Sequence, residues 1–512
     1  MLLLLTMSYF IKQKIGKNEY IYEVTSFWDP SSKKSKQKRK YIGKLTPEGE
    51  IITPKKSMKI IEIKDFGDIY LLQQISKTTG LYDVLEAVFP DEAKDIINIA
   101  IFLVITQTNI YNYKAWSKRN NIESQLSYVY YIEDFLKKIA RSEDKINEFF
   151  RLWNVKQNNP KCVYYDVGLT LDSSNITDWY YSEDRLNFKL NFGVAFSRAT
   201  NIPIFYKLYL KNVIDADSLE NVYNSSKANN IEIDFFITRP DYCTQYDINK
   251  ISKLPKSFLL PISSNTFLPK SILNRIFNNF NLKKINFEKN YYLYAKKNIE
   301  FYNSALILHL FLSEQKKIAQ VDNFIGKLSD LETIVNNKVF SNTKELIFFM
   351  ENKLKESTSL YDISYNGETV IISKKKHGIS KLFNRAGKIA IVTNDISIGS
   401  KEILFFKKEK DIIENFFKKI NSEVSQYSLQ SKEYFKGRFF LYFIAFIIYK
   451  TLTLKIQKKD TLSKYTLDEI LDNLRKIKKI TLSNNNTILS DIAPEQKRIL
   501  DELHVKVPKQ II

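Results

Sequence analysis

The sequence contains few of the residues that form disulfide frameworks or zinc sites. Its 512 residues include only two cysteines, Cys162 and Cys243, and three histidines. Two cysteines do not make the disulfide framework of a small secreted domain, and no Cys/His group has the spacing of a zinc site. We therefore expect a protein of the reducing cytoplasm, in which any metal site is made of carboxylates.

Long hydrophobic runs are also rare. The strongest candidate covers residues 439–449, eleven apolar residues before Lys450, whereas a membrane-spanning helix needs about 20. The apolar residues at 1–7 lack a basic leader and are too few for a secretory signal peptide. We therefore expect a buried core helix at 439–449, no signal peptide and no membrane partner.

Acidic residues are outnumbered by basic ones. The 57 Asp and Glu stand against 78 Lys and Arg, which leaves a net charge of +21. Such an excess favours a polyanionic partner, and nucleic acid first of all. An AT-rich genome, which raises Lys, Asn, Ile, Tyr and Phe together, is an alternative cause of part of the excess. The hydrophobic share of 44% and charged share of 26% are ordinary for a globular protein.

The first segment alternates between apolar and polar residues. The alternation predicts paired strands at residues 9–14 and 20–24, joined at Gly16. A Lys-rich loop at residues 31–40 follows and carries six positive charges. We expect this loop to contact DNA phosphates, with a plain solvated turn as the alternative. The expected DNA contacts in it are Lys38, Arg39 and Lys40.

The rest of the chain divides by its hydrophobic periodicity. Helical spacing dominates after the first segment, and three short strands, a crossover helix and further apolar strands follow it, an order that suits a ribonuclease-H-like mixed sheet. We expect six units: a basic β-rich unit at 8–55, a helical domain at 60–155, the first part of the α/β domain at 160–265, an α+β insertion at 266–400, the last part of the α/β domain at 401–455 and a basic helical tail at 456–512.

Two carboxylates stand out by their surroundings. Asp166 interrupts a strand of buried character, where a lone carboxylate is costly unless it is paired or bound to metal; the alternative is a solvated strand end. Glu414 lies on the basic face of a late helix, beside Lys410, and the alternative is a solvated i, i+4 ion pair. Carboxylates from separate elements are what two Mg²⁺ ions need in phosphodiester cleavage.

Six short segments match, in order, motifs of one known family. The sequence resembles the DDE insertion-sequence transposases from about Tyr9 to Leu454. Tyr165–Gly168 corresponds to Tyr-Asp-Val/Leu-Thr, which carries the family's first Asp. The other segments correspond to Gly-Tyr-Ser-Lys-Asp, Gly-Ile-Pro-Ile, Pro-Gly-Asn-x-x-Asp, Ile-Thr-Asn-Asp and Lys-Gly-x-Leu-Phe, and lie at 180–184, 201–204, 210–215, 391–395 and 436–440.

The resemblance implies a function and a site. It implies a ribonuclease-H-like catalytic domain that cuts and joins double-stranded DNA, both the element's terminal repeats and the target, as a homodimer. Two Mg²⁺ or Mn²⁺ ions would be held by Asp166, Asp241 and Glu414. Contacts with DNA would come from the basic residues of the last helix, Lys407, Lys410 and Lys418.

The sequence departs from the family at two places. The second Asp normally stands in Ala-Asp-Arg-Gly, but here Arg239 takes the ungapped position and Asp241 comes two residues later. The last helix has Lys407, Lys410 and Asn421 around Glu414, where the family has Tyr, Arg and Lys. Two hypotheses follow: an active transposase that uses Asp241, or a catalytically inactive, transposase-derived DNA-binding protein. A host nuclease is less favoured, because the resemblance extends into both flanking regions.

Overall fold

The protein has two compact units, which are described separately. In the computed structural model, one unit consists of Met1–Lys64, Ile477–Asp491 and Pro508–Ile512, and the other of Asp65–Lys476 and Ile492–Val507. The structure describes residues 7–29, 34–46, 49–52, 59–120, 122, 129–172, 187–209, 216–242, 244–262, 282–288, 290–337, 344–345, 347–348, 361–365, 370–374, 380, 386–421 and 432–506. Two of the motif segments, 180–184 and 210–215, lie outside these residues.

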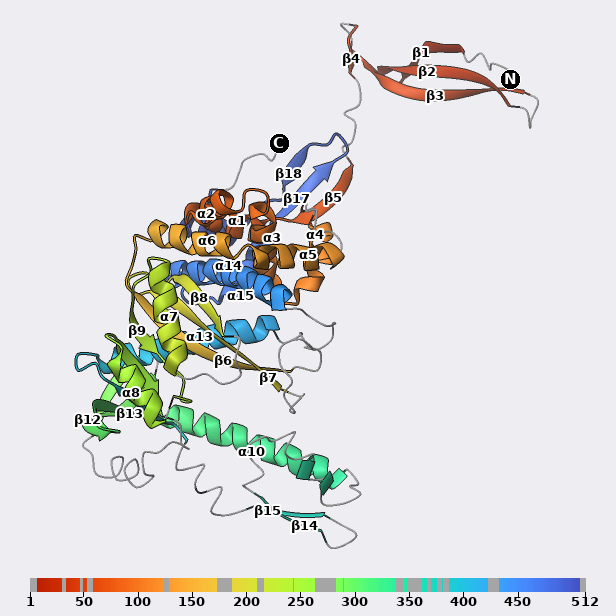
Figure 1. Ribbon diagram of the computed structural model, residues 1–512. Coiled ribbons are helices and arrows are strands. Elements are labelled where there is room, and N and C mark those ends of the chain that lie inside the picture. Colours follow the sequence, from red (N-terminus) through yellow and green to blue (C-terminus); the bar gives the residue numbers. More distant parts are fainter. Residues whose placement is uncertain are drawn as a thin grey trace. The chain divides into compact units, whose positions relative to one another are not determined.

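The first unit begins with an antiparallel sheet (Figure 1), in the order β1 (Met7–Ile15), β2 (Asn18–Asp29), β3 (Lys34–Leu45) and β4 (Ile51–Ile52). The predicted hairpin is present, and Gly16 turns it at a φ of 62°. The prediction of a loop at 31–40 is wrong from Lys34 onward, because β3 pairs with β2 along Asp29 to Glu19. Lysine has a low intrinsic strand propensity, and cross-strand pairing overrides it here.

A second, three-stranded sheet in this unit joins residues from both ends of the chain. Its order is β18 (Thr487–Leu489), β17 (Lys478–Leu482) and β5 (Ile60–Asp65). The predicted helical tail is therefore wrong at its centre: α15 (Leu467–Arg475) and α16 (Pro494–Glu502) flank a β-hairpin. The turn of this hairpin is the asparagine run 484–486, with Asn485 at a φ of 63°. This run is a turn signal that the sequence-based prediction did not use.

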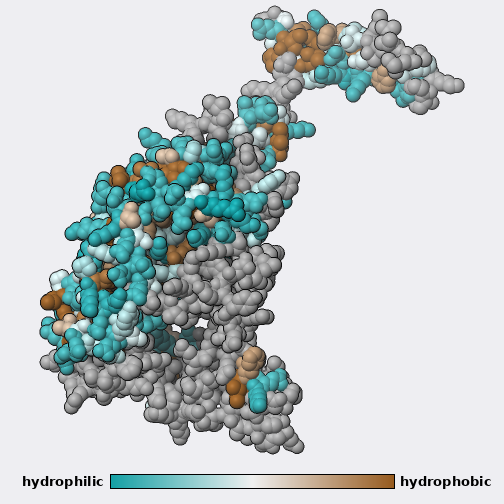
Figure 2. Space-filling view, in the orientation of Figure 1, coloured by the Kyte–Doolittle hydropathy of each residue, from teal (hydrophilic) through white to brown (hydrophobic). Residues whose placement is uncertain are grey.

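Helices surround one long apolar helix, α14 (Lys432–Gln457), in the second unit. Every residue from 439 to 448 is at most 1% exposed. α14 is long and apolar enough to cross a membrane, but 78% of its most apolar window is buried against the protein, as in a core helix. The surrounding helices present a mostly hydrophilic surface (Figure 2). They are α1 (Gly67–Thr78), α2 (Leu81–Val88), α3 (Ala93–Thr106), α5 (Val129–Arg141) and α6 (Glu143–Lys156), and α4 (Tyr113–Arg119) packs on α3.

A nine-stranded mixed sheet forms the rest of the second unit, so the fold is of the mixed α/β class, as predicted. Its strand β6, third from the β8 edge, is antiparallel to β7 and parallel to β9, and β9 is parallel to β10. The strand order is β11 (Lys283–Phe287), β12 (Asn290–Phe301), β13 (Ser304–Leu312), β16 (Lys388–Thr393), β10 (Ser257–Pro261), β9 (Ile233–Ile237), β6 (Cys162–Asp172), β7 (Asn187–Ser197) and β8 (Pro203–Tyr209).

The segment 266–400, expected as an insertion, contributes four of these strands, β11, β12, β13 and β16. It also contains α10 (Glu314–Asn337) and the hairpin of β14 (Tyr361–Tyr365) and β15 (Val370–Lys374). α7 (Ala216–Ala228) lies between β8 and β9 in the chain, and α8 (Gln245–Lys253) between β9 and β10. α13 (Ser400–Asn421) packs on β6, where the Phe406 ring contacts Tyr165 and Phe235.

Candidate functional site

Asp166 lies on β6, an interior strand of the mixed sheet between β7 and β9. It faces Gly193 of β7 across the strand pair and is 0% exposed. Burial raises the pKa of its carboxyl group, and the charges of Arg239 and Lys410 and the hydroxyl of Tyr242 act in the opposite direction. A buried carboxylate is tolerated only when it is paired. The sequence-based interpretation of Asp166 as a buried carboxylate that needs a partner is thus confirmed.

The partner of Asp166 is Arg239. Arg239 follows β9, the parallel neighbour of β6, so its side chain emerges beside Asp166. Its Nε donates to Oδ2 of Asp166 at 3.2 Å, and its Nη1 donates to Oδ1 of Asn191 at 2.7 Å. The same Nη1 lies 3.6 Å from Oδ2 of Asp241. The guanidinium group therefore lies between the two aspartates, where a shared divalent cation would have to bind.

Gly168 provides the space for this guanidinium group. A Cβ atom at position 168 would lie 2.5 Å from Nη1 of Arg239 and 3.3 Å from Oδ1 of Asn191. The transposase motif that Tyr165–Gly168 resembles has Thr at this position. In this chain the smaller Gly168 occurs together with Arg239. Sequence reasoning missed the role of Gly168, although its signal was visible as the missing Thr of that motif.

Lys410 links Glu414 electrostatically to Asp166 and Arg239. Lys410, one turn earlier on α13, donates from Nζ to the carbonyl oxygen of Thr238 at 2.9 Å. Burial lowers the pKa of Lys410 to about 8, against the opposing effect of Asp166 and Glu414. Burial also raises the pKa of Glu414, which Lys410 partly offsets. Asp166 and Glu414, distant in sequence, thus interact with one ammonium group.

The remaining predicted residues have different surroundings. The side chain of Asp241 is 63% exposed and contacts Arg239. Lys407 lies 3.6 Å from Asp411 on α13, and Lys418 is exposed near the end of that helix. The predicted DNA contacts of the first unit, Lys38, Arg39 and Lys40, are exposed on β3.

The charges around Asp166 form an ion-pair cluster, in which cationic side chains surround the carboxylate. Two cations, Arg239 and Lys410, stand next to Asp166. Each would repel a divalent ion at short range in a poorly solvated site. Within the described part of the chain, no group of three or more His, Cys, Asp or Glu residues could hold a metal ion. The arrangement pairs charges, and it leaves no open set of carboxylates.

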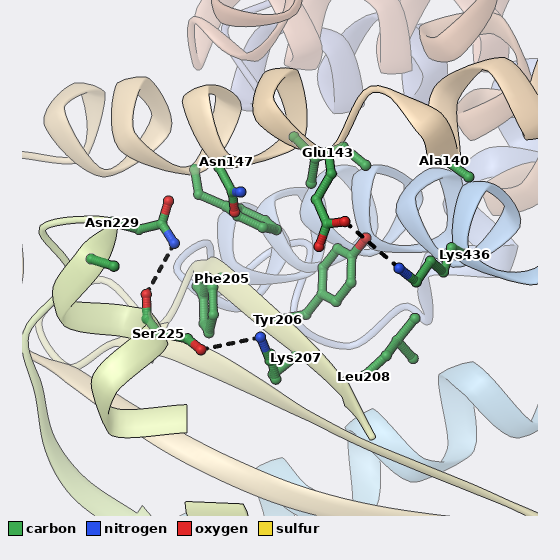
Figure 3. A pocket seen from close by; sticks show the side chains of 13 residues that line it. Ala140, Glu143, Asn147, Phe205, Tyr206, Lys207, Leu208, Ser225, Asn229 and Lys436 are labelled. Atoms are coloured by element: carbon green, nitrogen blue, oxygen red, sulfur yellow. Dashed lines mark hydrogen bonds and ion pairs between the residues drawn. The ribbon is translucent and has the colours of Figure 1, made fainter. Parts of the chain in front are cut away.

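A separate cavity of about 400 Å³ opens between α6, β8, α7 and α14 (Figure 3). Lys207 donates to Oγ of Ser225 at 3.1 Å, and burial lowers its pKa. Lys436 lies 3.8 Å from Glu143 across the opening. None of these residues was expected as a site residue from the sequence, and the floor of the cavity is formed by the buried rings of Phe150 and Phe205.

No protein-family model matches the chain, and no curated protein matches it. The geometry around Asp166 and Arg239 and the charge of the surface are the features of the molecule that bear on its function.

Proposed function

We propose that the chain is a transposase-derived DNA-binding protein that does not cut DNA. The observation that carries the proposal is the pair of Arg239 and Asp166, with 3.2 Å between Nε and Oδ2. Phosphodiester cleavage by two metal ions requires carboxylates that converge on the ions. An Arg that is always charged, and that already occupies its carboxylate, is incompatible with that arrangement.

The sheet supports a transposase origin. Its strands β8, β7, β6, β9 and β10 follow each other in this spatial order, with β7 antiparallel to β6 and with β6, β9 and β10 parallel. This topology supports a ribonuclease-H-like domain. Asp166 lies on β6, and Glu414 lies on α13, a late helix that packs on β6. This arrangement supports the assignment of both residues to the family's catalytic positions.

The charge distribution supports DNA as the partner. The chain carries +21, and the lysines of β3 are exposed to solvent. Contacts with phosphates need no metal ion, because affinity comes from the release of counterions. A protein without a metal centre can therefore keep its DNA affinity while it loses catalysis.

An active transposase is the second candidate, and one observation favours it. Asp241 is largely exposed and already touches Arg239. If the loop turned Arg239 outward, Asp241 could join Asp166 and Glu414 around two Mg²⁺ or Mn²⁺ ions. The protein would then act on the terminal repeats of its element as a homodimer.

The test combines binding and cleavage with the purified full chain. We expect binding to duplex DNA that is the same in EDTA and in Mg²⁺, that weakens steeply with salt, and that is accompanied by no nicking of supercoiled plasmid. Nicking by the wild type that needs Mg²⁺ or Mn²⁺ and disappears in Glu414→Gln would establish the second candidate instead. Absence of any salt-dependent DNA binding would refute both.

A further inference from the structure

The pairing of β3 with β2 sorts the basic residues of β3 onto two faces. Successive side chains of a strand point to opposite sides, and residues directly opposite each other share a side. In the observed register Lys34, Lys36, Lys38 and Lys40 lie opposite Asp29, Phe27, Thr25 and Glu23. Ion pairs of Lys36 with Asp29 and of Lys40 with Glu23, the latter at 3.8 Å, agree with this register. We call these four lysines the lysine face.

The residues between them belong to the other side. Nε2 of Gln37 donates to the hydroxyl of Tyr9 at 3.0 Å, and the ring of Tyr41 lies 5.6 Å from that of Tyr22. Arg39 lies opposite Val24, which is only 1% exposed. Arg39 and its two neighbours Lys38 and Lys40 therefore do not form one contact surface, although they are consecutive in sequence.

A lysine-rich edge strand has another possible explanation. In the described part of this sheet, β4 covers only Lys44 and Leu45 of β3, so the rest of β3 is an edge. Lysines protect edge strands from pairing with other chains. Such protection requires a charge near the edge but not a particular face. Here every position of one face from 34 to 40 is Lys, and the other face carries Ser35, Gln37 and Arg39.

We propose that the lysine face binds the phosphates of one strand of duplex DNA, with β3 running along the backbone. This inference rests on the proposed function. Alternate residues of a strand are about 6.8 Å apart, and one strand of B-DNA carries one charge per about 3.4 Å of its axis. Because the backbone winds around that axis, neighbouring phosphates lie farther apart than this axial rise, so successive lysines match successive phosphates of the strand. The exposed rings of Phe27 and Phe10, on the same side, provide apolar contacts beside them.

The test compares neighbouring cations that differ in face but not in charge. Each phosphate contact contributes about 0.9 to the slope of log K against log salt. We expect Lys38→Gln to lower the slope by about one contact, and Lys36→Gln/Lys38→Gln by about two. Arg39→Gln should lower it by less than half as much as Lys38→Gln. Lys497→Gln, on the exposed face of α16, is the control for charge alone and should leave the slope unchanged.

The outcomes separate this inference from the proposed function. Equal effects of Lys38→Gln and Arg39→Gln in a protein that still binds DNA would refute the lysine face and leave the proposed function standing. A wild type without salt-dependent DNA binding would refute both. If Lys36→Gln/Lys38→Gln lost binding to anionic lipid vesicles but kept DNA binding unchanged, the lysine face would bind a membrane surface instead of DNA. Circular dichroism of each variant checks that the sheet is folded.

Discussion

The guanidinium group of Arg239 fills the space beside Gly168, because a Cβ atom on Gly168 would lie only 2.5 Å from Nη1 of Arg239. Gly168 belongs to β6, two residues after Asp166, and Arg239 follows β9. The two residues lie 71 positions apart in sequence (239 minus 168), yet the position of the Arg239 side chain depends on the residue at 168. An Arg at 239 reaches Asp166 because position 168 has no side chain.

The first prediction follows from this contact. Gly168→Ala should lower the free energy of unfolding by about 1–3 kcal/mol, since the added methyl group would push the guanidinium group of Arg239 away from the buried Asp166. Chemical denaturation measures the loss. Gly399→Ala is the matched control, because nothing lies within 4 Å of a Cβ there. Equal stability of the two variants would contradict the account.

The second prediction concerns the buried ion pair. Arg239→Leu and Asp166→Asn should each cost about 3–5 kcal/mol of unfolding free energy, because each leaves a buried charge without its main partner. The double variant should lose less than the sum, with a coupling of about 1–3 kcal/mol.

The control for this cycle is the exposed pair of Arg151 and Glu148, whose Nη1 and Oε2 are 2.8 Å apart and whose side chains are each 44% exposed. Its coupling should be at most about 1 kcal/mol. If the Asp166 and Arg239 variants added independently, the guanidinium group would not be the partner of the buried carboxylate.

The third prediction is a pH dependence that comes from Lys410. Its pKa is lowered from 10.5 to about 8 in the folded protein, so between these values the unfolded chain binds more protons. Stability rises with pH wherever the unfolded state binds more protons. The contribution of Lys410 to the unfolding free energy should therefore increase from pH 8 to 10.5. The wild type should gain stability relative to Lys410→Met over this range, and a constant difference between them would exclude a buried ammonium group.

Some features of the centre could be predicted from the sequence. Asp166 was recognisable because apolar neighbours on both sides predict a buried strand, and Glu414 because an apolar stripe defines the opposite face of its helix. The geometry of Arg239 was not predictable in the same way. Arg239 at the ungapped position and Asp241 two residues later left two arrangements open, and only the register of β9 against β6 decides which side chain reaches Asp166.

Two elements were predicted wrongly for a common physical reason. Both predictions relied on the intrinsic secondary-structure preference of the segment, whereas pairing with a distant strand determines its structure. Residues 34–40 are poor strand formers, and they become a strand because β2 offers a complementary edge with Glu23 and Asp29. Residues 478–489 lie in a basic stretch between helices, and they form a hairpin that joins β5, distant in sequence.

The most direct test of the central claim is a titration of the full-length protein with Mn²⁺, followed by electron paramagnetic resonance. We expect the wild type to bind no Mn²⁺ that depends on Asp166 or Glu414, because Arg239 and Lys410 interact with these carboxylates. Asp166→Asn and Glu414→Gln should therefore leave the Mn²⁺ titration unchanged. A wild-type Mn²⁺ site that is lost in both variants would show that Asp166 and Glu414 form a metal centre.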